Sequence, residues 1–215
     1  MPDVIFNGPA GRLEGRYLAG EGSAAPIAIV LHPHPQFGGT MNNKVVYRIF
    51  HAFAGRGFAT LRFNFRGVGR SQGTFDNGTG ELSDAAAALD WLQTFNPDAP
   101  HCWIAGFSFG AWISMQLLMR RPEIAGFISV APPANMYDFG FLAPCPSSGL
   151  IVQGTADEVV SEGSVAKLAA KVDSQKSITV QYAKIEAANH FFTAKLDEMM
   201  QVIDTYLTSR LGPPA

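Results

Sequence analysis

Cysteine is scarce in this sequence, which has only Cys102 and Cys145 among its 215 residues. Two cysteines can build neither a disulfide framework nor a four-cysteine zinc site. Cys102 begins an apolar, strand-like run, and Cys145 lies in a loop between prolines. We therefore expect both to be free thiols.

An excess of either charge is also missing. Lys and Arg number 16 against 18 Asp and Glu, which gives a formal net charge of −2, and no block of like charges stands out. This balance excludes a strong basic field for nucleic acid and an acidic tail. It favours a small neutral partner, here a small-molecule substrate.

Long apolar runs are absent, since no stretch approaches the roughly 18 apolar residues that a membrane-spanning helix needs. The first residues, MPDVIFNGPAG, lack the positive region and the long apolar stretch of a signal peptide. We expect a cytoplasmic protein without membrane contact.

The sequence does contain enough apolar material, 47% of its residues, for one sizeable core. We expect a single domain over residues 1–215. Short apolar runs alternate with helical patterns, which is the signature of a doubly wound α/β fold with helices on both faces of the sheet. The expected strands are 4–7, 12–18, 27–32, 59–65, 102–107, 126–131, 149–154 and 178–185, and the expected helices are 42–56, 81–95, 109–120, 161–173 and 193–210.

Most of these strands are apolar on both faces, so the sheet should be mostly parallel. The first two strands are joined by GPAG, which is too short for a crossover. We expect them to form an antiparallel hairpin at the edge of the sheet.

Ser108 stands out in the stretch GFSFG, between a buried strand and a predicted helix. A turn this tight holds its central residue in strained geometry with the side chain above the sheet, and it brings the residues two before and two after close together. Gly106 and Gly110 remove the side chains that would collide there. The pattern predicts a nucleophile, although a glycine-rich turn with an incidental serine gives the same five letters.

A serine needs a base and an orienting acid, and both are found downstream at strand ends. Asp157 follows the strand 149–154, with Glu158 as the adjacent competitor, and His190 follows the last strand. The order Ser108, Asp157, His190 is that of an α/β-hydrolase triad. Singly, Asp157 could be a capping carboxylate and His190 a structural histidine.

The loop LHPHPQFGGTMNNK, residues 31–44, leaves the strand expected beside that of Ser108. His32 and His34 form only a weak metal pattern, without a third ligand. The loop can instead supply one backbone amide of an oxyanion hole, the other coming from Phe109. We assign the second donor to Gln36, with His34 as its nearest rival.

Together, GFSFG, GTADEVV, NHFF, LHPHPQFGGTMNNK and NFRGVGRSQG resemble the serine α/β-hydrolase superfamily, in its small esterase branch related to dienelactone hydrolases. The resemblance spans almost the whole chain. It implies an eight-stranded sheet with Ser108 as nucleophile, His190 as base and Asp157 as acid. Because no ligand set is evident in the sequence, we expect no metal and no cofactor. Dienelactone hydrolases use a cysteine nucleophile, so their particular activity is not implied.

The expected function is hydrolysis of carboxylic esters through an acyl-enzyme. A thioesterase, a small peptidase and a non-catalytic binding protein on the same scaffold remain alternatives. Residues 132–148 are too few for a cap, so we expect a lidless, shallow groove that favours short acyl chains. Phenylalanines should border this groove, from the set Phe37, Phe107, Phe109, Phe139, Phe141 and Phe191.

Overall fold

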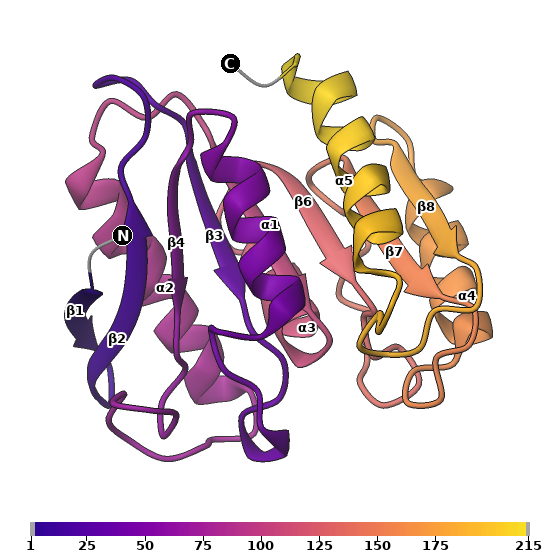
Figure 1. The fold of residues 1–215 in the computed structure, drawn as a ribbon, viewed down its shortest axis with the longest axis horizontal. Coiled ribbons are helices and arrows are strands. Elements are labelled where there is room, and N and C mark those ends of the chain that lie inside the picture. Colours follow the sequence, from indigo (N-terminus) through magenta and orange to yellow (C-terminus); the bar gives the residue numbers. More distant parts are fainter. Residues whose placement is uncertain (1–2, 214–215) are drawn as a thin grey trace.

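The computed structural model describes residues 3–213, whose eight strands form one sheet in the order β1-β2-β4-β3-β5-β6-β7-β8 (Figure 1). Strands β3 to β8 are parallel where they pair, and β2 pairs antiparallel with β4. The strands are β1 (Asp3–Gly8), β2 (Gly11–Leu18), β3 (Ile27–Leu31), β4 (Ala59–Phe63), β5 (Cys102–Phe107), β6 (Ile124–Val130), β7 (Gly149–Gly154) and β8 (Val180–Ile185). The predicted mostly parallel, eight-stranded α/β sheet is confirmed.

The predicted edge hairpin is also present, since β1 pairs antiparallel with β2 in the register Phe6↔Leu13 and Gly8↔Gly11. Some strand ends differ from the prediction by one or two residues. Strand β4 ends at Phe63 instead of residue 65, because the backbone N–H of Phe65 donates to the ring of His32 and not to a neighbouring strand.

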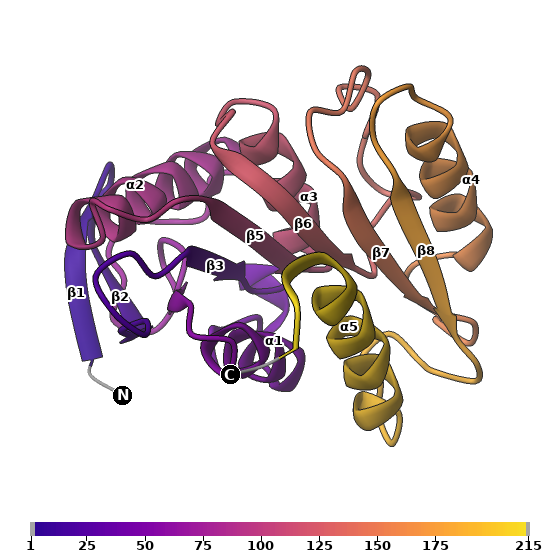
Figure 2. The ribbon, with the colours of Figure 1, turned by 90° about the horizontal axis from the view of Figure 1, so that it is seen from above.

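Helices cover both faces of the sheet (Figure 2). One face carries α1 (Lys44–Ala54) and α5 (Leu196–Leu211), and the other carries α2 (Thr79–Phe95), α3 (Phe109–Leu118) and α4 (Glu162–Asp173). Helix α5 begins three residues later than predicted, because residues 189–195 form turns after the last strand. These turns carry His190.

Two apolar cores lie on the two sides of the sheet, and alternate residues of each central strand supply them. Ile27, Ile29 and Leu31 of β3 face the core under α2 and α3, whereas Ala28 and Val30 face the core under α1 and α5. This period of two is the geometry of an extended strand. Because both faces of the sheet are buried, the polar side chains of a candidate site lie at the ends of the strands.

The connection between β6 and β7 contains no helix, so no cap domain covers the carboxyl ends of the strands. The absence of a cap agrees with the sequence prediction. None of the helices within residues 3–213 has the length and apolar character needed to cross a membrane.

Candidate active site

Ser108 occupies the single residue between the end of β5 and the start of α3. Its backbone has φ 54° and ψ −120°, which a side chain rarely adopts and which costs on the order of 1–3 kcal/mol. A Cβ at Gly106 would lie 2.2 Å from the carbonyl oxygen of Gly110. The two glycines therefore permit the close approach that the turn requires, as the spacing in GFSFG predicted.

The same turn also lies against the end of β3 and the loop that follows it. A Cβ at Gly110 would lie 2.5 Å from the carbonyl oxygens of both Leu31 and His32. The start of α3 thus rests directly on the end of β3. The chain that leaves β3 is held beside the serine for this reason.

The structure brings the three predicted side chains into one hydrogen-bonded row. His190 Nε2 lies 3.1 Å from Ser108 Oγ, and His190 Nδ1 lies 2.8 Å from Asp157 Oδ2. Ser108 and His190 are 8% and 6% exposed, and the Asp157 side chain is fully buried. The serine hydroxyl therefore has one neighbour that can accept its proton.

Asp157 is held by more donors than the histidine alone. Its Oδ1 accepts hydrogen bonds from the backbone N–H groups of Val159 and Val160, at 2.8 and 2.7 Å. Its Oδ2 also accepts from Gln153 Nε2 at 3.0 Å. Burial by itself would raise the pKa of Asp157, but the hydrogen bonds from His190 and the two amides outweigh it and hold that pKa below its usual value.

The alternative acid, Glu158, is exposed and does not contact His190. Gln153 was missed by the sequence reasoning because it lies inside a strand, where a glutamine gives no signal of its own. It is fully buried on β7, four residues before Asp157.

The backbone amide of Phe109 begins α3 and makes no hydrogen bond within residues 3–213. The Gln36 amide, predicted as its companion, already has a hydrogen-bond acceptor, and the choice of the second donor stays a prediction. Gln36 is exposed, and its N–H donates to His34 Nδ1 at 3.2 Å.

The hydrogen bonds within the loop distinguish the backbone amides of Gln36 and His34. The N–H groups of Phe37 and Gly39 both donate to the carbonyl oxygen of His34, in a short 3₁₀ turn over Pro35–Phe37. The N–H of His34 has no partner among the described residues. Of the two donors considered from the sequence, His34 is the one with a free amide.

His32 is a buried structural residue whose hydrogen bonds support this loop. Its Nδ1 lies 2.6 Å from the carbonyl oxygen of Pro33, and its Nε2 accepts the N–H of Phe65 at 3.0 Å. Complete burial lowers the pKa of His32 to about 4. Both ring nitrogens are occupied, and residues 3–213 contain no group of three or more His, Cys, Asp or Glu that could hold a metal ion.

A cavity of about 420 Å³ opens beside Ser108 and His190. Three of the six predicted phenylalanines line it, namely Phe37, Phe109 and Phe191. Phe107 and Phe139 are core residues, and Phe141 stacks on Phe139 with ring centroids 5.9 Å apart. The remaining lining comes from Pro33, His34, Gly38, Gly39, Asn43, Pro133, Met136, Tyr137 and Val159.

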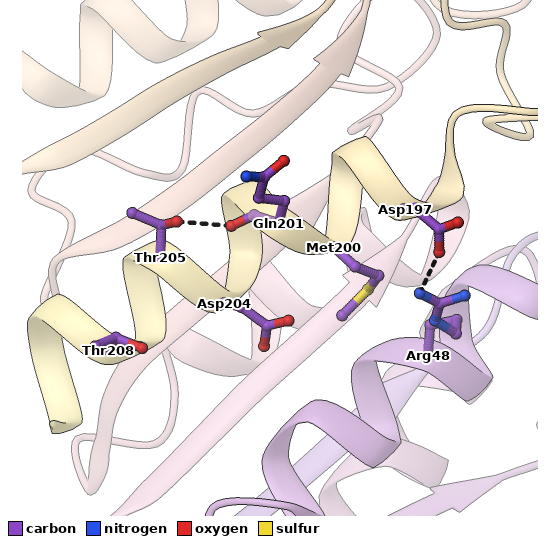
Figure 3. A pocket seen from close by; sticks show the side chains of 7 residues that line it. All are labelled: Arg48, Asp197, Met200, Gln201, Asp204, Thr205 and Thr208. Atoms are coloured by element: carbon purple, nitrogen blue, oxygen red, sulfur yellow. Dashed lines mark hydrogen bonds and ion pairs between the residues drawn. The ribbon is translucent and has the colours of Figure 1, made fainter. Parts of the chain in front are cut away.

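A second hollow, of about 560 Å³, lies between α1 and α5 (Figure 3). Its lining is charged or polar apart from Met200, and Arg48 pairs with Asp197 at 2.6 Å. Asp204 is likewise paired, with Arg56 at 2.9 Å. None of its seven lining residues is a serine, cysteine or histidine, so it holds no nucleophile with a base.

The fold and the serine at the β5–α3 turn define an α/β hydrolase. Comparisons with known proteins agree. Residues 17–210 match the family described as X-Pro dipeptidyl-peptidase (S15 family). The chain therefore belongs to this family of α/β serine hydrolases.

Three solved structures are closely similar. A protein of unknown function from Agrobacterium tumefaciens, described as a candidate α/β hydrolase, is 63% identical, with a TM-score of 0.96 over 98% of this chain and 96% of that one. An α/β serine hydrolase homologue from Coxiella burnetii is 41% identical, with a TM-score of 0.86 over 96% and 97%. A serine hydrolase without a lid from Xanthomonas campestris is 32% identical, with a TM-score of 0.88 over 100% and 96%.

Proposed function

We propose that the protein hydrolyses carboxylic esters of short acyl chain, with Ser108, His190 and Asp157 as its catalytic triad. The observation that carries this proposal is the row of hydrogen bonds from Ser108 Oγ through His190 to Asp157, at 3.1 and 2.8 Å. It opens directly onto the apolar cavity. A nucleophile, its base and a binding surface thus coincide.

In the acylation step, Ser108 Oγ attacks the ester carbonyl carbon while His190 Nε2 takes the hydroxyl proton. The carbonyl oxygen becomes an oxyanion that accepts hydrogen bonds from the amides of Phe109 and His34. The carbon–oxygen bond to the alcohol then breaks, and His190 returns the proton to the departing alkoxide. Asp157 accepts the Nδ1–H of His190 throughout and so fixes the tautomer that exposes Nε2 to the serine.

In the deacylation step, water attacks the acyl group on Ser108 while His190 accepts one of its protons. The second tetrahedral intermediate collapses, the proton passes to Ser108 Oγ, and the carboxylic acid leaves. Each cycle consumes one ester and one water and regenerates the serine. The step needs no cofactor.

The preference for short acyl chains rests on the cavity. Its volume of about 420 Å³ is near the lower end of the range for small-molecule sites, and no helix between β6 and β7 covers it. A further methylene gains about 0.8 kcal/mol only while it is still buried. We expect kcat/KM to decline beyond roughly six to eight acyl carbons.

A second candidate is a peptidase, and the specific observation in its favour is the description of the matched family as X-Pro dipeptidyl-peptidases. The same triad can cleave an amide or a thioester, because it activates the serine without choosing the leaving group. These reactions differ in the substrates that they consume. They can therefore be separated by assay.

The test compares p-nitrophenyl esters from acetate to palmitate with a matched thioester and a dipeptidyl X-Pro anilide. We expect the short esters to be the best substrates, and Ser108→Ala to lose nearly all turnover while it folds normally. Faster cleavage of the anilide would favour the peptidase. No hydrolysis of any member would favour a binding protein on a hydrolase scaffold.

A further inference from the structure

The cavity beside Ser108 contains no formal charge of its own. Of the fourteen residues that line it in the described part of the chain, none is Asp, Glu, Lys or Arg. Its polar side chains are Ser108, Asn43, Tyr137 and two histidines, His34 and His190. Two of these belong to the proposed triad, so the substrate-binding surface is made from neutral groups.

His34 does not supply a positive charge either. Burial lowers the pKa of His34, with a smaller opposing effect of Glu81. Its Nδ1 acts as an acceptor for the Gln36 amide at 3.2 Å, which requires an unprotonated nitrogen. Its ring lies among those of Phe37, Phe75 and Phe109, with centroids 4.7 to 4.9 Å away. It therefore adds an aromatic face to the cavity.

Three carboxylates close in sequence or by contact to the lining residues accept hydrogen bonds elsewhere or lie outside the cavity wall. Asp157 is fully buried and already accepts four hydrogen bonds, from His190, Gln153, Val159 and Val160. Glu81 is buried and accepts the backbone N–H groups of Asp76 and Gly78. Glu158 is exposed and is not part of the cavity wall.

The rim extends this uncharged surface outward. Phe37 is 85% exposed, Phe191 56%, Met136 52% and Val159 46%. Met136 and Val159 come from different loops that are joined by a hydrogen bond from Asn135 Nδ2 to the Val159 carbonyl at 3.1 Å. A substrate end that reaches past the cavity thus meets these four apolar side chains.

We propose that this site selects esters whose acyl and alcohol parts are both uncharged, and that it rejects substrates with a free ammonium group, including peptides with a free N-terminus. The inference rests on the proposed ester hydrolysis. An enzyme that removes dipeptides must receive a terminal ammonium, and an unpaired charge is strongly disfavoured in an apolar site. Here the wall offers no carboxylate to pair with it.

The test uses two esters of the same shape, p-nitrophenyl heptanoate and p-nitrophenyl ε-aminohexanoate, whose chains end in a methyl and an ammonium group. We expect wild-type kcat/KM to be about 100-fold or more higher for the heptanoate. Met136→Glu and Phe37→Glu place a carboxylate on two parts of the rim. At least one of them should narrow this ratio about tenfold or more, while Met136→Gln and Phe37→Gln should not.

Equal hydrolysis of the two esters, within a factor of about three, would overturn the inference and leave the proposed esterase standing. A large ratio that neither glutamate variant narrows would also overturn it, because the discrimination would not then arise from the missing counter-charge. No hydrolysis of either ester would overturn the proposed function itself, and the inference with it. Glu158→Gln serves as a check, since rejection of the ammonium ester should be unchanged in that variant.

Discussion

Of the two hollows described above, the larger has no nucleophile with a base and the smaller has one. The larger, between α1 and α5, measures about 560 Å³ and is lined mainly by charged and polar side chains, of which Arg48 and Asp197 form an ion pair (Figure 3). The smaller, about 420 Å³, has an apolar wall with Ser108 and His190 in it. The lining of the larger hollow includes no serine, cysteine or histidine. The smaller one holds a hydroxyl aligned with a base.

The difference follows from where each hollow lies on the sheet. The groove between α1 and α5 is a seam between two helices on one face, where exposed side chains satisfy each other. The cavity lies where β3, β5 and β7 end, and parallel strands bring the loops after them to one edge. Strain is also concentrated there, at Ser108. Volume is therefore a poor guide to function in this fold.

Among variants that keep both Ser108 and His190, the largest change is expected from Asp157→Asn, which removes the carboxylate and leaves the size of the side chain. An amide in this place cannot hold the productive tautomer of His190, so kcat should fall on the order of 10³- to 10⁴-fold. Steady-state hydrolysis of p-nitrophenyl butanoate measures this loss. Glu158→Gln is the matched control and should retain wild-type turnover, and the reverse pattern would show that Glu158 is the acid.

The next effect concerns His32, which supports the loop behind the cavity. Its pKa of about 4 in the folded protein lies below the ordinary 6.5, so the unfolded chain binds the proton more readily. This contribution is constant above about pH 6.5 and destabilises the fold progressively as the pH falls toward 4. Between pH 7 and pH 5 it should remove about 2 kcal/mol.

Urea unfolding at the two pH values measures this loss, and His32→Gln should reduce the pH dependence more than the half-buried His101→Gln does. A proton NMR titration of the native protein gives the same information without a substitution. A His32 ring that titrates near pH 6.5 would contradict the account.

A smaller effect is expected at Gln153, which donates to the oxygen of Asp157 that also accepts the hydrogen bond from His190 Nδ1. Gln153→Met keeps the length of the side chain and removes this donor. We expect kcat to fall about tenfold with KM nearly unchanged, because the acid is less firmly oriented while the cavity wall is untouched. Gln181→Met, an exposed position on β8, is the matched control. A change in KM alone would contradict a positioning role.

The smallest effect is expected in the other hollow. Asp197→Ala breaks the ion pair with Arg48, but the Asp197 side chain is 91% exposed and the pair is screened by water. The free energy of unfolding should change by less than about 1 kcal/mol, and ester hydrolysis should not change. A loss of activity comparable to that of Gln153→Met would show that the groove between α1 and α5 takes part in function.

Much of the candidate site could be predicted from the sequence, because its residues lie at the ends of predicted strands. Ser108, Asp157 and His190 each follow an apolar run, and in a parallel sheet such positions meet at one edge. The second oxyanion donor could not be chosen this way. Whether Gln36 or His34 has a free amide depends on hydrogen bonds inside a 3₁₀ turn, which the letters of the loop do not reveal.

The phenylalanines that line the cavity were likewise only partly predictable from the sequence. Phe139 and Phe191 both occur in loops, yet Phe139 is buried in the core and Phe191 borders the cavity. Hydrophobicity predicts that a side chain leaves water but not which apolar surface it joins. Gln153 is the converse case, because the strand pattern around it gives no reason to expect a polar contact to Asp157.

The central claim is that Ser108 is the residue activated for attack, and covalent labelling tests it most directly. The native protein is treated with a fluorophosphonate, and the modified residue is located by mass spectrometry of its peptides. We expect one adduct per chain, on Ser108, that forms in step with the loss of esterase activity and is absent from Ser108→Ala. An adduct on another residue, or full hydrolysis by protein whose Ser108 is completely labelled, would contradict it.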